Sequence, residues 1–131
     1  MKLTPAETGL LREIAGLMVP ASAELGMPGA DDPVILADIA GSIGRELPLV
    51  RQALRSFEAG QDVNAWYKAG GAASAALGRA ILFAYYRDDR VLKALGHEAR
   101  APYPKGYAVE QGDWSLLDIV RKREPFWRKV S

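Results

Sequence analysis

The sequence predicts an all-α protein, a small bundle of about five helices followed by a long irregular C-terminal strap. Apolar residues recur at helical spacing in several segments, and no segment of useful length alternates as a half-buried strand would. Helix-start signals, in which a capping residue precedes a proline, introduce two of these segments. Helical periodicity stops near residue 97. We therefore expect a helical domain over residues 1–97 and a strap over residues 98–131, both parts of a single domain.

The first helix is expected to begin at Thr4-Pro5-Ala6-Glu7, where a hydroxyl cap, a proline and a returning glutamate form a capping box. Pro20 ends this helix, and a loop rich in turn residues follows. Leu25 and Met27 are predicted to reach from that loop into the core. The predicted inner face of the first helix consists of Leu10, Leu11, Ile14, Leu17 and Met18.

The second helix is predicted to start at Asp32-Pro33, and the third to run from about Leu47 to Ala59 with a stop at Gly60. Arginines of this region are expected on a solvated outer face. The predicted buried residues are Ile35 or Leu36, Ile39 and Ile43 in the second helix, and Val50, Leu54 and Phe57 in the third. The predicted outward arginines are Arg45, Arg51 and Arg55.

Asp62 is expected to cap a short turn that holds Trp66 and Tyr67. The most apolar helix follows and is predicted to be the central one, with alanines four apart forming a smooth packing face. Its alanines are Ala72, Ala76, Ala80 and Ala84, and its large buried residues are Leu77, Ile81 and Tyr85. A last short helix, capped by Asp88 or Asp89 and ended by Gly96, is predicted to use Val91, Leu92 and Leu95.

Composition excludes several classes of function. With 17 Lys+Arg against 16 Asp+Glu and no long block of like charge, the chain is not expected to bind nucleic acid. The absence of cysteine excludes disulfides, iron–sulfur clusters, thiolate zinc sites and thioether-linked haem. The one histidine, His97, follows a glycine at a helix end, and the Asp31-Asp32 and Asp88-Asp89 pairs stand where caps are needed. We therefore predict no catalytic residue, no metal ligand and no cofactor bound by this chain.

The sequence is not expected to insert into a membrane, because its most apolar window, 72–86, is too short to span one and contains Arg79. Met1-Lys2-Leu3 runs directly into a helix start rather than into an export leader. This predicts a cytoplasmic protein, or a periplasmic one if a leader has been processed or omitted.

The strap is predicted to bind a partner protein. Large aromatic and arginine side chains dominate binding energy when a partner buries them, and prolines reduce the entropy that a free segment loses on binding. The alternative is that the strap folds back over the helices of its own chain. The predicted interface residues are Tyr103, Pro104, Tyr107, Asp113, Trp114, Leu117, Arg121, Trp127 and Arg128.

Four stretches carry a family resemblance: 18–25, Tyr85 to Gly96, Pro102 to Tyr107, and Gly112 to Leu117. Together they resemble the gluconate 2-dehydrogenase subunit 3 family. Members of that family are small non-catalytic subunits of bacterial flavin-dependent dehydrogenases, whose large subunit belongs to the glucose-methanol-choline oxidoreductases.

The resemblance implies that FAD and the catalytic base lie in a large flavoprotein dehydrogenase subunit, which this chain would stabilise, mature or escort. A cytochrome subunit would be the electron acceptor where electrons pass to a quinone. Two alternatives remain open from the residues alone. One is a helical adaptor or regulatory binding protein unrelated to redox chemistry, and the other is a self-contained enzyme with a polar pocket.

Overall fold

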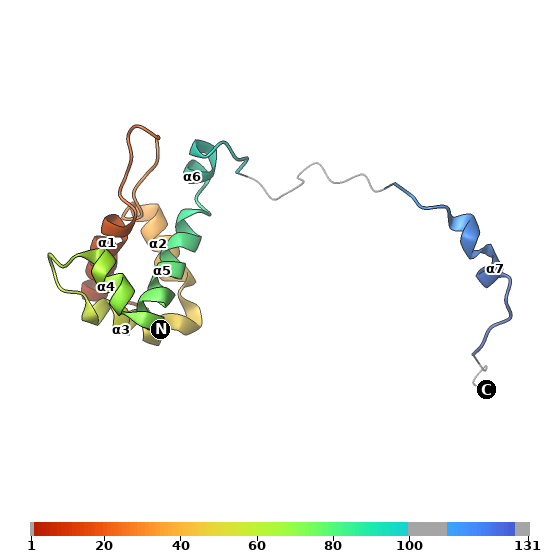
Figure 1. Cartoon of the computed structure of the whole chain (residues 1–131), viewed down its shortest axis with the longest axis horizontal. Helices are drawn as coiled ribbons and strands as arrows, with labels where there is room; N and C mark the ends of the chain where they lie inside the picture. The colour runs from red at the N-terminus through yellow and green to blue at the C-terminus, as the bar shows by residue number, and fades with distance from the viewer. Residues whose placement is uncertain (1, 100–109, 128–131) are drawn as a thin grey trace. The chain divides into compact units, whose positions relative to one another are not determined.

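The structure, a computed structural model, describes residues 2–99 and 110–127. These residues form helices and no strand, so the predicted all-α class is confirmed (Figure 1). The chain divides into two units, Met1–Ala99 and Arg100–Ser131. The first unit contains the helices α1 Pro5–Met18, α2 Pro33–Ser42, α3 Leu47–Ser56, α4 Val63–Ala69, α5 Gly71–Tyr85 and α6 Asp89–Ala94, with a 3₁₀ turn η1 at Gly44–Glu46. The second contains a 3₁₀ turn η2 at Trp114–Leu117 and the short helix α7 Asp118–Arg121.

The predicted helix starts are confirmed by their hydrogen bonds. At α1 the Glu7 amide donates to Thr4 Oγ1 at 3.2 Å, and Glu7 Oε2 accepts from the Thr4 amide at 2.9 Å, which completes the capping box. Aspartates cap three further helices by accepting from amides of the first turn: Asp32 at α2, Asp62 at α4 and Asp88 at α6.

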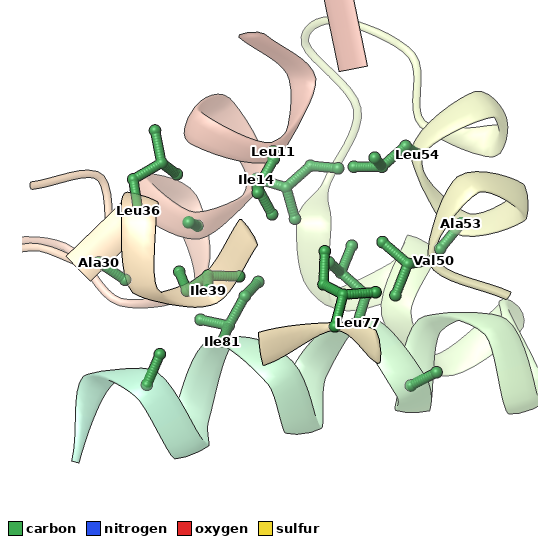
Figure 2. Packing of buried hydrophobic residues seen from close by; sticks show 14 of the residues in the cluster. Leu11, Ile14, Ala30, Leu36, Ile39, Val50, Ala53, Leu54, Leu77 and Ile81 are labelled. Carbon is green, nitrogen blue, oxygen red and sulfur yellow. The ribbon is translucent and has the colours of Figure 1, made fainter. Parts of the chain in front are cut away.

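The core lies between α5 and the helices packed on it. α5 contacts α2, α3 and α4, and α1 packs against the same three helices, as expected for a central α5. Figure 2 shows side chains from α1, α2, α3 and α5 converging on one apolar cluster. Its members include Leu11, Ile14, Ile35, Leu36, Ile39, Val50, Leu54, Leu77 and Ile81, all buried as predicted.

Two predicted core leucines are instead on the surface: Leu17 is 49% exposed and Leu25 is 63% exposed. The buried side of α1 is centred on Leu11, and Leu17 lies roughly a third of a turn away from that centre. Leu25 sits in the turn of a narrow hairpin whose ends, Ser22 and Met27, exchange backbone hydrogen bonds of 2.9 Å. Only Met27, at the base of the hairpin, packs against the core as predicted.

This hairpin loop is joined to α5 by Tyr85. The Tyr85 ring is buried, and its hydroxyl donates to the Pro28 carbonyl at 2.9 Å. Burial also raises the pKa of the Tyr85 hydroxyl, since ionisation would place a charge away from water. Tyr85 therefore fixes the loop between α1 and α2 against the end of α5.

Arg51 corrects the prediction of a fully solvated arginine face on α3. Its side chain is only 23% exposed, and its Nε lies 3.0 Å from Glu7 Oε1 on α1. Its Nη2 also donates to the Lys2 carbonyl at 3.0 Å. The Thr4 amide and the Arg51 guanidinium lower the pKa of Glu7. Arg51 thus connects the first turn of α1 to α3, while Arg45 and Arg55 are exposed as expected.

The predicted alanine face of α5 is also only partly correct. Ala76 and Ala84 are buried, Ala80 is half-buried and Ala72 is exposed. A line of residues four apart turns by about 40° per step on a helix with 3.6 residues per turn, so it passes from solvent into the core. The large residues Leu77, Ile81 and Tyr85 are all buried as predicted.

The end of α6 is a Schellman motif, in which the His97 amide donates to the Leu92 carbonyl and the Gly96 amide to the Lys93 carbonyl. Gly96 adopts φ = 79°, which a residue with a side chain rarely does. His97 is therefore an exposed residue at a helix end, as predicted. Within the described residues, no helix is both long and apolar enough to cross a membrane.

Candidate interface in the C-terminal strap

The described part of the strap is partly helical, whereas the sequence predicts an irregular segment. Asp113 accepts a hydrogen bond from the Ser115 amide at 3.0 Å, and η2 and α7 follow it without interruption. The Ser115 hydroxyl and amide lower the pKa of Asp113. Asp113 was predicted as an interface residue, and the structure shows it as the cap that starts this helical segment.

Every residue from 110 to 127 is exposed, including seven large apolar side chains. Leucine, isoleucine and tryptophan side chains in such density are seldom left in water, so this exposed group is a candidate contact surface. The exposed residues are Trp114, Leu116, Leu117, Ile119, Val120, Phe126 and Trp127.

Three of the predicted interface residues share one side of the helical segment. Trp114, Leu117 and Arg121 are spaced three and four residues apart, which aligns side chains on a helix. Trp114 Nε1 donates to Gln111 Oε1 at 3.2 Å, and Trp127 lies beyond the end of α7. The predicted interface residues Tyr103, Pro104, Tyr107 and Arg128 lie outside the described residues.

Four exposed apolar residues were missed by the sequence prediction, which concentrated on aromatic and arginine side chains. They are Leu116, Ile119, Val120 and Phe126. Three of them belong to two apolar doublets, Leu116-Leu117 and Ile119-Val120, and a doublet in a helix places its two side chains about 100° apart. These doublets are the sequence feature that could have indicated the additional exposed apolar residues. The helical segment also carries Ser115, Asp118 and Arg121, so it is amphipathic with a broad apolar side.

Basic side chains follow the apolar group. Arg121 lies 3.6 Å from Asp118, a weak exposed ion pair, and Lys122 comes next in the chain. The Arg123 guanidinium stands over the Phe126 ring, 5.7 Å from its centre. A partner that covers this segment would need an apolar cleft with acidic groups near the end of α7.

A surface hollow of about 850 Å³ lies along α3 in the helical unit. Its arginines offer little for catalysis, because Arg51 is already paired with Glu7 and Arg55 is exposed. Within the described residues, no three His, Cys, Asp or Glu side chains lie close enough to hold a metal ion. The residues that line the hollow are Gly44, Leu47, Pro48, Arg51, Gln52, Arg55 and Ser56.

Comparison of the chain with protein families, with curated proteins and with solved structures found no match.

Proposed function

We propose that this chain is the non-catalytic small subunit of a heteromeric FAD-dependent dehydrogenase that acts on a sugar or alcohol. In this proposal the flavin and the catalytic groups belong to a large subunit of the glucose-methanol-choline class. The small subunit stabilises, matures or escorts that flavoprotein, and residues 98–131 are the segment that binds it.

The exposed apolar group of the strap carries the binding part of this proposal. Seven large apolar side chains, from Trp114 to Trp127, are not buried by the strap itself. Burying a side chain of that size is worth about 1.5 to 3 kcal/mol, so a partner groove that covers several of them gains substantial affinity. The flavoprotein identity of the partner rests on the sequence resemblance, which includes the stretch Gly112 to Leu117.

The proposal predicts that Trp114→Ala weakens association with the flavoprotein. Tryptophan anchors in an interface typically cost about 2 kcal/mol or more when truncated, which corresponds to roughly thirtyfold in the dissociation constant. The measurement is affinity purification of the full chain from its native host, followed by flavin absorbance of the captured partner and titration of the purified pair.

Glu110→Ala is the matched control, because Glu110 is an exposed polar residue of the same segment and is not one of the basic side chains near the end of α7. It should leave the dissociation constant unchanged. Unaltered binding of the Trp114→Ala variant would exclude the strap as the interface. Capture of a partner that contains no flavin would instead support the helical adaptor and remove the redox role.

A further inference from the structure

The last helix of the first unit, α6, is attached to the rest of that unit by few contacts. It has six residues, and Val91 is the one among them that is buried. The helices α1 to α5 pack extensively on one another, whereas α6 makes no extensive contact with any of them. A helix this short is not stable in water by itself, so α6 depends on the contacts that attach it.

One of these attachments is apolar and the other is ionic. Val91 is fully buried and belongs to the core cluster. The residue before it, Arg90, places Nη2 2.8 Å from Asp32, the cap of α2, and 3.0 Å from Asp88, the cap of α6 itself. Among the described residues, the contact of Arg90 with Asp32 is the one ion pair that joins α6 to another helix.

The two carboxylates around Arg90 are held in place. The side chains of Asp32 and Asp88 are only 22% and 10% exposed, and each accepts hydrogen bonds from backbone amides of the helix that it caps. Both contact the same nitrogen of Arg90, so they are close to each other. Without the Arg90 charge, two fixed carboxylates would therefore repel each other at the point where α6 meets α2.

The chain just before α6 is attached more firmly. Eight residues of α5 are buried, and Tyr85 at its end donates to the Pro28 carbonyl. Arg87, in the turn between α5 and α6, lies 2.6 Å from Asp38 on α2. Segments that differ this much in burial open separately in native proteins, and the less buried one opens more often. An opening of α6 would thus begin after Arg87 and leave α5 in place.

We propose that α6 is a releasable latch at the root of the strap, which detaches as a unit when Arg90 leaves Asp32, while α1 to α5 stay folded. The strap follows α6 directly in the sequence. Opening of α6 therefore adds residues 88–97 to the chain that connects the strap to the core, and it extends the reach of the strap by up to roughly 30 Å. This inference goes beyond the proposed function, because it does not depend on what the strap binds.

The test is native-state hydrogen exchange of the full chain, followed by NMR. The amides of Leu92, Leu95 and His97 report on α6, because each donates to a carbonyl between Asp88 and Leu92. The amide of Ile81, a buried residue of α5, reports on the core. The α6 amides should exchange about a hundredfold faster than that of Ile81, at rates that low concentrations of urea barely change.

Three variants locate the contacts that matter. Arg90→Gln should speed exchange of the α6 amides about fivefold. Lys93→Gln is the matched control, because it removes the same charge from the same helix at an exposed residue that forms no ion pair with the described acids. It should leave those rates unchanged. Val50→Ala, in the core part of α3, should speed exchange at Ile81 but not in α6, because the core is intact when α6 is open.

Two results would overturn the inference. The α6 amides could exchange as slowly as that of Ile81 in the wild-type chain, or Val50→Ala could accelerate both equally, and either finding would show that α6 opens only with the whole core. Equal rates in Arg90→Gln and Lys93→Gln would show that the contact between Arg90 and Asp32 does not hold α6.

Discussion

Arg90 joins the first turns of two helices by holding both of their capping aspartates. Its guanidinium donates to the two oxygens of Asp32 at 2.8 and 3.0 Å and to the two oxygens of Asp88 at 3.0 Å. Each aspartate also accepts from backbone amides of the helix that it caps, α2 or α6. The Arg90 hydrogen bonds, ahead of these amides, hold the pKa of Asp32 at about 2, below its ordinary value of 3.8.

This arrangement predicts a pH-dependent loss of stability on replacing Asp32 by asparagine. Asparagine still caps a helix, but it lacks the charge that Arg90 binds, so at neutral pH the free energy of unfolding should fall by about 1 kcal/mol. Because the folded-state pKa of Asp32 is lowered, its contribution is complete above pH 4 and disappears as the pH falls toward about 2. Denaturant unfolding of both proteins across that interval measures the difference.

The control for this experiment is Asp31→Asn. Asp31 is the neighbouring exposed carboxylate, and it makes no hydrogen bond with its side chain among the described residues. Its replacement should leave the pH profile unchanged. The free energy of unfolding of the wild type could instead fall in parallel with that of Asp32→Asn between pH 4 and pH 2. That result would show that Arg90 does not lower the pKa of Asp32.

The junction between α4 and α5 depends on a backbone conformation rather than on a contact. Gly71 adopts φ = 56° as the chain passes from one helix to the next, and nothing lies within 4 Å of where a Cβ would stand. Any side chain at this position is therefore strained by its backbone alone. Gly9, inside α1, likewise has open space around it, but its backbone is helical.

These two glycines predict opposite effects of the same substitution. Gly71→Ala should lower the free energy of unfolding by about 1 kcal/mol through left-handed strain. Gly9→Ala should raise it by roughly 0.5 to 1 kcal/mol, because alanine is the better helix former and stiffens the unfolded chain. Urea unfolding of the two variants measures both values, and a change of the same sign in both would refute the backbone explanation.

At the scale of the whole molecule, the buried hydrophobic residues of the described chain all fall between Leu11 and Val91. The cap of the last helix in the first unit, the Schellman motif ending at His97, is also formed within that unit. We infer that the first unit contains its own complete core. We therefore expect the apolar side chains of the strap to add little to the stability of the helices.

This predicts that a chain ending after Ala99 folds as the full chain does. Its helical circular dichroism should be retained, and its free energy of unfolding should lie within about 1 kcal/mol of the full-length value. Binding of the flavoprotein should be lost. A loss of several kcal/mol on truncation would mean that the strap completes the core of its own chain, which is the alternative interpretation of its aromatic residues.

The helix starts could be predicted from the sequence because a cap acts over two or three residues. Thr4 with Glu7, and the aspartates at positions 32, 62 and 88, bond to amides in their own first turn, and those contacts form wherever the helix lies. The buried residues predicted for α2 and α3, and the large buried residues predicted for α5, are correct for a similar reason. Their spacing determines which side of the helix is apolar before any partner is chosen.

Contacts between distant parts of the chain could not be predicted in this way. The pairing of Arg51 with Glu7, and of Arg90 with Asp32, joins residues far apart in sequence, and no local pattern states which arginine will meet which acid. The exposure of Leu17, Leu25 and Phe83 was also decided by tertiary packing, since an apolar residue is buried only where another element covers it.

By itself, then, the sequence determined the class of the fold, the places where helices begin and the side of each helix that is apolar, because these depend on neighbours within a turn or two. Only the tertiary structure decided which apolar sides were used. The other helices of this unit pack only on the side of α5 that carries Leu77 and Ile81. Leu82, Phe83 and Tyr86 therefore stay exposed.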